Sequence, residues 1–289
     1  MEDQKRKRRA KGQTRQVLER LITNKSAILG LIILIVLIII AIAAEWIMPY
    51  SYDGIDFLNA YASPSAAHWF GCDELGRDIF SRILYGARYS LAIGIISVAL
   101  ALVMGSIIGA VAGYYGGLVD NVLMRMLDIL SAIPSMLMAI VISSVMGPGF
   151  DKCFLAIAVS TMPQYARVLR SSIMGLRNME YLEAAESINC SNVRIILKHI
   201  IPNAFSAVLV TATMNVGTGI LMAASLSFIG LGVQPPTPEW GAMLAGARAY
   251  IRDYPHMIIF PGIAIMMTVL SLNMLGDGLR DAVDPKLKK

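Results

Sequence analysis

Long uncharged hydrophobic runs alternate with shorter polar segments along this chain, and they predict membrane-spanning helices. The first run, from Ala27 to Ala44, holds 18 consecutive residues without a charge, which is close to the roughly 20 apolar residues that a helix needs to cross the hydrocarbon layer. Pro134 and Pro163 lie inside two later runs, where neighbouring helices can satisfy the freed carbonyls. The six expected spans are about 27–44, 88–112, 121–146, 153–170, 204–228 and 257–276.

The composition agrees with a membrane protein. The 289 residues are 56% hydrophobic and 16% charged, with a mean hydropathy of +0.62, whereas soluble domains carry about 25% charged residues. A cleaved signal peptide is the alternative interpretation of the first run. That run is too long for a signal-peptide core, and the basic stretch before it is unusual for a signal peptide. We therefore expect an all-α membrane protein with about six transmembrane helices.

Lysine and arginine are unevenly distributed between the two sets of loops. If the N-terminus is cytoplasmic, the segments on that side hold sixteen of these residues and the loops on the other side hold five. Because cytoplasmic loops are enriched in Lys and Arg, we expect a multi-pass protein of the cell membrane with both termini in the cytoplasm. The basic N-terminal tail suits anionic lipid headgroups. Nucleic-acid binding is not expected, since no recognition module accompanies the tail.

The spans and loops divide the chain into four parts. Residues 1–25 form a basic cytoplasmic tail, and residues 26–87 hold the first span and a long extracytoplasmic loop. Residues 88–280 form the core membrane domain, which includes a cytoplasmic loop at 177–202, and residues 281–289 form a second tail. A second outer loop at 229–256 opens with a run of Gly and Pro, which is typical of a rigid turn, and residues 243–253 are expected to form a short interfacial helix.

Two spans carry small or polar residues at every fourth position, which places them on one helix face. Small residues let membrane helices approach closely, so simple packing is the first interpretation. Asn215 differs, because an amide near mid-membrane needs water or a partner. It indicates either a water-lined path or an interhelical hydrogen bond. The path candidates are Thr211, Asn215, Gly219 and Met222. The two stripes are Ser97, Ala101, Gly105, Gly109, Gly113 and Gly117, and Ala207, Thr211, Asn215, Gly219, Ala223 and Ser227.

The chain shows no sign of catalytic chemistry or of a resident cofactor. It has no His-Glu-x-x-His, no Gly-x-Ser-x-Gly and no Gly-x-x-x-x-Gly-Lys phosphate loop, so it is not expected to be an enzyme. The three cysteines, Cys72, Cys153 and Cys190, fit no metal-site spacing. A bridge between Cys72 and Cys153 stays open, since both fall on the outer side.

The 181–202 segment is unusually polar and structured for a loop between two spans. Tyr181 to Ile188 is expected to be helical, and Asn189 marks a break. Ser191 is a candidate cap for a second helix, which is expected to reach about Ile200 and to end before Pro202. A compact helix–break–helix knob is typical of a docking site for a soluble partner.

The same segment resembles the coupling loop of ABC-importer permeases, whose pattern is Glu-Ala-Ala, three residues, Gly, nine residues, Ile, one residue, Leu-Pro. The spacing is kept throughout, with Asn in place of the Gly; Asn tolerates a positive φ better than most residues. The residues that the resemblance assigns to coupling with an ATPase are Glu183, Ala184, Ala185, Asn189, His199 and Pro202.

Further motifs resemble the C-type permease subunit of the dipeptide, oligopeptide and nickel branch of this family. They are HWFGCDELGRDIFSR (68–82), YGAR (85–88), ASLSFIGLGVQPPTPEWG (224–241) and NMLGDGLRD (273–281). The resemblance implies the architecture of a type I importer permease. It also implies a heterodimer with a second similar permease, two cytoplasmic ATPases that bind ATP and Mg, and an extracytoplasmic solute-binding protein.

The resemblance favours import of dipeptides or oligopeptides, with nickel or another small solute as the alternative. A stand-alone channel or secondary transporter is the alternative from another class, but the spans are almost free of the acidic residues that coupling ions would need. The candidates for docking the binding protein are Asp73, Glu74, Arg77 and Trp240. The charged residues among them could equally form local ion pairs, and Trp240 could be a headgroup anchor.

Overall fold

The computed structural model describes residues 19–177, 179–180, 187 and 190–283. Within these residues the chain is helical and forms no β-strand beyond one bridge between Cys72 and Asp78, which confirms the all-α expectation. The long helices are α3 (Lys25–Ile47), α4 (Ile79–Tyr115), α5 (Gly117–Ser131), α6 (Ser135–Met146), α7 (Phe150–Leu176), α10 (Ile201–Phe228) and α12 (His256–Val283). The short elements are η1 (Phe57–Asn59), α9 (Asn192–Ile195), the π-helical η2 (Ile196–Ile200), α11 (Trp240–Ala247) and η3 (Arg248–Tyr250).

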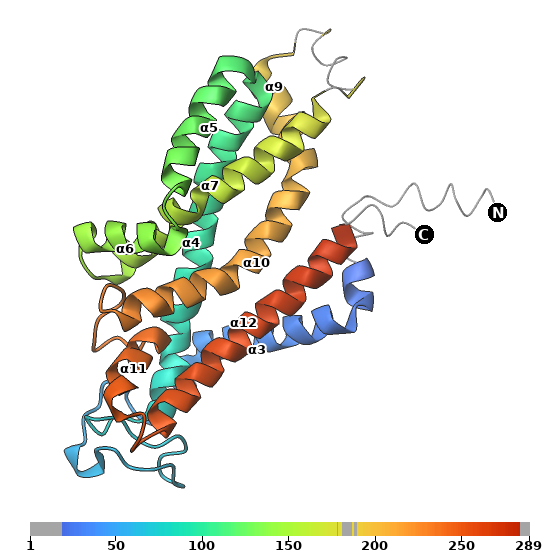
Figure 1. The fold of residues 1–289 in the computed structure, drawn as a ribbon. Coiled ribbons are helices and arrows are strands. Elements are labelled where there is room, and N and C mark those ends of the chain that lie inside the picture. The colour runs from blue at the N-terminus through green and yellow to red at the C-terminus, as the bar shows by residue number, and fades with distance from the viewer. Residues whose placement is uncertain (1–18, 178, 181–186, 188–189, 284–289) are drawn as a thin grey trace, which may run out of the picture.

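The helices form an elongated bundle with two distinct ends (Figure 1). One end carries residues 48–78, α11 and the start of α12, and we call it the loop end. The start of α5 and the end of α7 lie at the opposite end together with α9, and we call it the α9 end. Helices α11 and η3 account for the short helix expected within 243–253, although the helix begins earlier, at Trp240.

Four helices in the described part of the chain, α3, α4, α10 and α12, are long and apolar enough to cross a membrane. The α5–α6 pair would add a fifth span, but the two helices are bent by 82° at their junction. Helix α7 coincides with the expected span 153–170, yet it is less apolar because Gln164, Arg167 and Arg170 interrupt its sequence. The expected count of six therefore becomes four clear spans, one bent pair and one polar helix.

The bend at Pro134 corrects the expectation of a continuous span over 121–146. Proline lacks an amide donor and disfavours helical conformation at the residue before it. Here α5 ends at Ser131, and Pro134 takes φ −52° and ψ 136° at the start of α6. Pro163, by contrast, lies inside an unbroken α7, as expected for a proline whose helix is held by neighbours.

Helix α4 begins nine residues earlier than the expected span, at Ile79, so residues 79–87 are helix rather than loop. Its 37 residues rise about 55 Å at 1.5 Å per residue, compared with a hydrocarbon core of about 30 Å. The helix therefore extends well beyond the apolar layer. Asp78 caps its first turn, and Gly116, with φ 65°, ends it.

The glycines expected on one face of α4 (Gly105, Gly109 and Gly113) pack against α7, which confirms the packing interpretation for them. Ser97 faces α10 instead, and Gly117 lies in α5 with no atom within 4 Å of an added Cβ, so the stripe is shorter than expected. A Cβ added at Gly105 would lie 2.6 Å from the carbonyl oxygen of Met162, and one at Gly113 would lie 3.0 Å from Cβ of Ile173. The α4–α7 pair is the most extensive helix contact in the structure. Its core includes Ala101, Tyr165, Ala166 and Leu169, all fully buried.

The stripe expected on α10 does not stay on one face. A helix turns by about 100° per residue, so every fourth residue drifts by about 40°. The stripe is partly exposed at Thr211 and Asn215, and it is buried from Gly219 onward. A Cβ at Gly219 would lie 3.2 Å from Oγ of Ser97 in α4. The second half of the stripe is therefore a packing surface.

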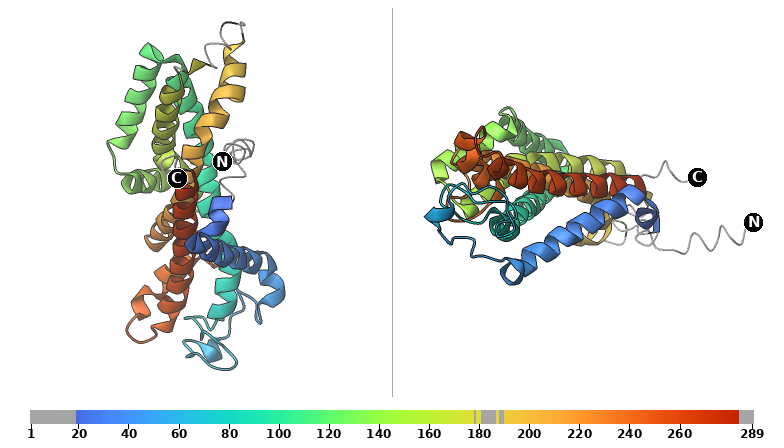
Figure 2. Two further views of the ribbon diagram at one scale, coloured as in Figure 1. Left: turned by 90° about the vertical axis from the view of Figure 1, so that its right-hand side faces the viewer. Right: turned by 90° about the horizontal axis from the view of Figure 1, so that it is seen from below.

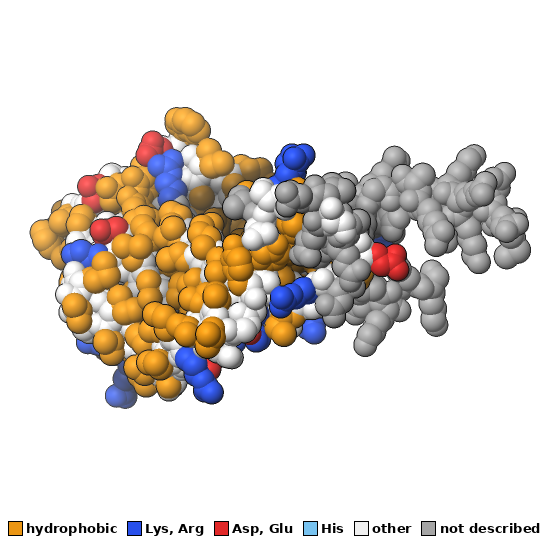
Figure 3. Space-filling view, turned by 90° about the horizontal axis from the view of Figure 1, so that it is seen from above, with side chains coloured by type: hydrophobic (Ala, Val, Ile, Leu, Met, Phe, Trp, Pro, Cys, Tyr) orange, Lys and Arg blue, Asp and Glu red, His pale blue; other side chains and the backbone are white. Residues whose placement is uncertain are grey.

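Helix α3 lies on the outside of the bundle and leans on α12 and α4 (Figure 2). A Cβ at Gly30 would lie 2.6 Å from the carbonyl oxygen of Ser271 in α12, so the two helices touch closely there. Much of the remaining α3 surface is exposed and apolar, including Ile32, Ile39 and Ile42, which are 53%, 57% and 63% exposed. Hydrophobic side chains also dominate the face seen in Figure 3, with charged side chains scattered among them. Such a surface suits lipid or protein contact rather than water.

Candidate functional site

Most of the residues expected to couple to an ATPase lie outside the described residues: Glu183, Ala184, Ala185 and Asn189. The side chain of His199 is also not described, although its backbone belongs to η2. Pro202 stands in the first turn of α10. Their coupling role therefore stays a prediction, and the structure bears on the segment that follows them.

That segment corrects one expectation, because the chain remains helical through Pro202. Helix α9 begins at Asn192, passes directly into the π-helical η2 and continues as α10. The amide of Ile201 donates to the carbonyl of Ile196, five residues back. Proline is tolerated in the first turn of a helix, where its missing N–H is not needed. π-helical turns are frequent at functional sites.

The α9–η2 segment is anchored to the bundle by two isoleucines. Ile195 and Ile200 are each 1% exposed, and they pack in the same core cluster as Leu169 and Ile173 of α7. The hydroxyl of Tyr114, near the end of α4, lies 2.9 Å from Oδ1 of Asn192. A movement of α9 would therefore press directly on α7 and α4.

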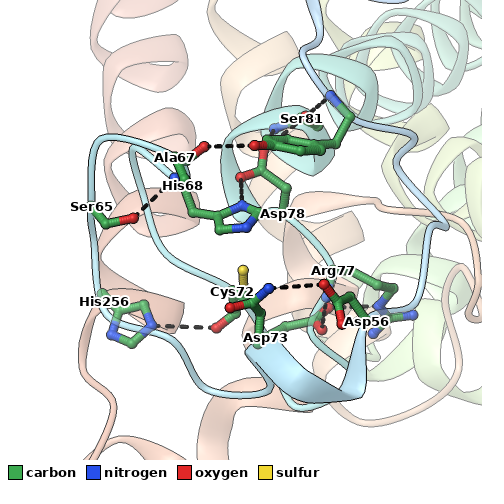
Figure 4. A network of polar contacts seen from close by, with 12 residues as sticks. Asp56, Ser65, Ala67, His68, Cys72, Asp73, Arg77, Asp78, Ser81 and His256 are labelled. Atoms are coloured by element: carbon green, nitrogen blue, oxygen red, sulfur yellow. Dashed lines mark hydrogen bonds and ion pairs between the residues drawn. The ribbon is translucent and has the colours of Figure 1, made fainter.

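At the loop end, Asp73 and Arg77 close a tight turn that is largely buried (Figure 4). The Asp73 carboxylate accepts from the amides of Leu75 and Arg77 at 2.9 and 3.0 Å, and from Nε of Arg77 at 2.7 Å. Arg77 also donates to Glu74 at 3.1 Å. Gly76 has φ 74°, and a Cβ there would collide with the backbone of Asp56. The alternative of local ion pairs is therefore the one that the geometry supports.

A second part of this network fixes the start of α4 (Figure 4). Asp78 is 2% exposed, and its Oδ2 accepts from the amide and the hydroxyl of Ser81, both at 2.7 Å. Its Oδ1 lies 2.9 Å from Nδ1 of His68. The hydroxyl of Tyr50 donates to the carbonyl of Ala67 at 3.1 Å. The loop from 49 to 78 is thus tied to the helix that it precedes.

Trp240 is buried as well, at 1% exposed, and its Nε1 donates to the carbonyl of Ile83. Glu239, also 1% exposed, caps α11 by accepting from the amides of Gly241 and Ala242, and it accepts from the hydroxyl of Ser90. Trp240 is therefore not a headgroup anchor. Of the four docking candidates, Asp73, Arg77 and Trp240 lie inside the fold, and Glu74 is the most accessible, with 28% of its side chain exposed. The docking role itself stays a prediction.

The cysteines are free, so the open question of a Cys72–Cys153 bridge is answered in the negative. Cys72 is fully buried in the loop network. Burial raises the pKa of its thiol to about 11, with smaller contributions from the charges of Asp78, Asp73 and Asp56. A neutral buried thiol is a poor nucleophile and a poor metal ligand.

Asn215 takes the interhelical hydrogen bond that was one of its two expected roles. Its Nδ2 donates to Oε1 of Gln164 at 3.0 Å and to the hydroxyl of Tyr165 at 3.1 Å, both on α7. Thr211, one turn away, donates its hydroxyl to the carbonyl of Ala207. Met222 is 8% exposed in a packed cluster. The assignment of these residues to a path stays a prediction.

The path candidates expected from the sequence do not include Gln164. The structure places its exposed amide beside Asn215. A signal was present in the sequence. Gln164 is the one amide within the run from Cys153 to Ala166, which otherwise holds apolar and hydroxyl residues, and a polar residue in such a run marks a candidate functional position.

The bundle of long apolar helices defines this protein as an integral membrane protein, and the family comparison identifies it as a membrane component of a transport system. Residues 105–289 match the family described as binding-protein-dependent transport system inner membrane component. Residues 12–64 match the N-terminal transmembrane domain of oligopeptide transport permease C. The chain belongs to this family of ABC-importer permeases, and it is a multi-pass membrane protein.

Curated relatives cover nearly the whole chain. The dipeptide transport system permease protein DppC of Alkalihalophilus pseudofirmus is 47% identical over 95% of this chain and 90% of that protein. The glutathione transport system permease protein GsiD of Pectobacterium atrosepticum is 45% identical over 95% of this chain and 91% of that protein. Among solved structures, an inward-facing form of the MetNI methionine ABC transporter aligns with a TM-score of 0.58 at 17% identity, over 71% of this chain and 98% of that one. An amino acid ABC transporter aligns with a TM-score of 0.51 at 16% identity, over 68% of this chain and 92% of that one. These two likenesses establish the type I importer fold.

Proposed function

We propose that this chain is the C-type permease subunit of an ATP-driven importer of short peptides, and that it pairs with a second, homologous permease to enclose the translocation path. The observation that carries the proposal is the close similarity to permeases of dipeptide and glutathione transport systems over 95% of the chain. Nickel or another small solute is the alternative cargo.

We further propose that the 177–202 segment couples this chain to a cytoplasmic ATPase. Glu183, Ala184, Ala185 and Asn189 would enter a cleft on that partner, and the α9–η2 segment would pass the movement on to α7 and α4. The burial of Ile195 and Ile200 against α7 supports this route. The two partner ATPases would bind ATP and Mg and carry out hydrolysis, and a solute-binding protein would deliver the cargo at the loop end.

In this proposal the α9 end and both chain termini are cytoplasmic. The distribution of Lys and Arg supports this orientation. The start and the end of the described chain also lie together, since Nη1 of Arg20 is 3.5 Å from the carbonyl oxygen of Ala282.

Glu183→Lys tests the coupling role, and Glu180→Lys is its matched control. Both variants make the same change of charge, but Glu180 lies outside the Glu-Ala-Ala motif. In vesicles that hold the complete transporter, we expect Glu183→Lys to abolish ATP-dependent peptide uptake and to weaken ATPase recruitment, with membrane insertion unchanged. Glu180→Lys should retain most of the uptake.

Two results would contradict the proposal. Normal uptake by Glu183→Lys would remove the docking role. Uptake by the chain with no ATPase present would favour a stand-alone channel or secondary transporter.

A further inference from the structure

The amides of Gln164 and Asn215 meet halfway along the two helices that carry them. Gln164 is the fifteenth of the 27 residues of α7, and Asn215 is the fifteenth of the 28 residues of α10. Helix α7 runs from the middle of the bundle to the α9 end, and α10 runs from the α9 end toward the loop end (Figure 1), so the amide pair lies between the two ends of the bundle rather than at either of them. Polar groups in such a position must find partners, because no bulk water is available to them in the apolar layer.

The pair satisfies only half of its own hydrogen-bonding capacity. Asn215 Nδ2 uses its two hydrogens on Oε1 of Gln164 and on the hydroxyl of Tyr165. This leaves Oδ1 of Asn215, an acceptor, and Nε2 of Gln164, which carries two hydrogens. Across the described residues, neither of these atoms has a hydrogen-bond partner. Gln164 is exposed and Asn215 is half-buried, whereas Tyr165 behind them is fully buried.

A free donor next to a free acceptor is the complement of a peptide group, which offers one C=O and one N–H. Residues 154–166 of α7 and 204–228 of α10 contain no Asp, Glu, Lys, Arg or His, and the next charge along α7, Arg167, is paired with Asp128 at 3.2 Å. A metal ion would lack the carboxylate or imidazole ligands that divalent metals prefer.

Two further hydroxyl groups lie along α10 beyond the pair. Thr218 and Ser225 are exposed and lie within about 100° of Asn215 around the helix. Their hydroxyls can each accept a hydrogen bond from a passing group. The exposed face of α10 therefore carries two hydroxyls beyond the amide pair, interspersed with apolar side chains such as Leu221, which is 45% exposed.

We propose that the Gln164–Asn215 pair is a substrate-contact site, at which Gln164 Nε2 donates to the carbonyl and Asn215 Oδ1 accepts from the amide of a peptide group in transit. This site rests on the proposed function as a peptide importer. It makes Gln164 a specificity-determining residue, favouring substrates with a backbone amide over metal ions or charged solutes without one.

The test uses proteoliposomes that hold the complete transporter, with radiolabelled Gly-Leu and glutathione as probes. Gln164→Met removes the amide at nearly constant volume. Gln164→Glu keeps an acceptor for Asn215 Nδ2 but replaces the free donor with an acceptor, so the interhelical bond remains and the substrate bond is lost. Thr213→Val is the matched control, because Thr213 lies about 160° from Asn215 around α10 and its hydroxyl donates to the carbonyl of Leu209 in its own helix.

We expect both Gln164 variants to lower kcat/KM for uptake about tenfold, which is the usual effect of one lost hydrogen bond. Stimulation of ATP hydrolysis by the binding protein should persist, and Thr213→Val should behave as the wild type. Wild-type uptake in either Gln164 variant would overturn the contact site. Gln164→Glu keeps an oxygen that accepts from Asn215, so a residue that only links the two helices would retain wild-type uptake in this variant.

Two further results separate the remaining cases. Absence of ATP-dependent uptake by the wild-type transporter would refute the proposed function itself. If both Gln164 variants fail to assemble, a benzophenone side chain at the exposed Thr218 position tests the contact site instead. Its cross-linking to radiolabelled Gly-Leu during turnover supports the contact site, and absence of cross-linking overturns it.

Discussion

Arg88 of α4 pairs with Glu45 of α3, with 2.6 Å between Nη1 and Oε1. The same guanidinium donates to the backbone of α3, from Nε to the carbonyl of Ala41 at 2.6 Å and from Nη2 to the carbonyl of Ile42 at 2.8 Å. The Arg88 side chain thus links α3 to α4 by three contacts. Two of them are to backbone carbonyls of α3 and do not depend on the side chains there.

Arg88→Met should loosen α3, because a charged donor bonded to two carbonyls contributes about 1.5–3 kcal/mol per bond. We expect the thermal midpoint of the purified chain to fall by several degrees and a protease site to open between residues 48 and 56. Arg88→Lys should recover only part of the loss, since an ammonium cannot reach three acceptors in a fork. An unchanged midpoint in Arg88→Met would show that packing alone holds α3.

Gly105→Val should prevent the α4–α7 pair from forming. A Cβ at this position already lies 2.6 Å from a backbone oxygen and 2.7 Å from Cβ of Tyr165, so the helices would have to separate along their main contact. We expect loss of folded protein from the membrane, measured by fluorescence-detected size exclusion of a tagged chain. Gly175→Ala is the control, because nothing lies within 4 Å of a Cβ there, and it should be neutral or slightly stabilising.

Asp78→Ala should weaken the loop end more than Asp78→Asn. Loss of a helix cap costs about 1 kcal/mol, and alanine also leaves His68 and Ser81 without their partner in a buried setting. Asparagine keeps an oxygen for the cap. The measurement is hydrogen exchange in residues 49–85, where we expect faster exchange in the alanine variant. Equal protection in the two variants would argue against the network as the support of this loop.

Cys72 should resist alkylation until the solution is strongly alkaline. The thiolate is the reactive form, and a folded-state pKa of about 11 keeps the thiol neutral at pH 7–9. Burial of the neutral thiol favours the folded state below the unfolded pKa of about 8.5, and this contribution is lost as the pH rises toward 11. In maleimide labelling, the half-buried Cys190 should react first and Cys72 only after denaturation. Fast labelling of Cys72 at pH 8 would contradict its burial.

Asn189→Gly should leave uptake close to the wild-type rate. The resemblance places a glycine at this position, and asparagine is among the residues that best tolerate a positive φ. The measurement is ATP-dependent uptake by the complete transporter. A loss of more than tenfold would show that the asparagine side chain makes a contact of its own with the partner.

A close-packing face on α4 could be predicted from the sequence, because glycine at every fourth position is a local signal with a direct steric meaning, but its partner α7 could not. The fate of the two prolines could not be predicted either. Pro163 continues a helix that α4 supports along its length, whereas Pro134 breaks its helix where packing is sparse. That difference depends on neighbours distant in the sequence.

The candidate site shows the same division. Local ion pairs are one of the two alternatives that the sequence leaves open for Asp73 and Arg77, and the structure shows the pair. The burial of this pair and of Trp240 depends on α11 and on the 49–78 loop meeting at one end of the bundle, and no local pattern shows that. Likewise Asn215 is recognisable as a polar residue in an apolar run, while its partner Gln164 is 51 positions away and becomes significant only once α7 and α10 are side by side.

The sharp turn between α5 and α6 has a consequence for topology. Whether or not that pair crosses the bilayer completely, α7 brings the chain back to the end from which α5 departs. The remaining long helices form two pairs whose members run in opposite directions, α3 with α4 and α10 with α12. The start of α3 and the last turn of α12 lie together, since Arg20 contacts Ala282, and in the orientation proposed above they share the compartment of α9 however the α5–α6 pair is counted.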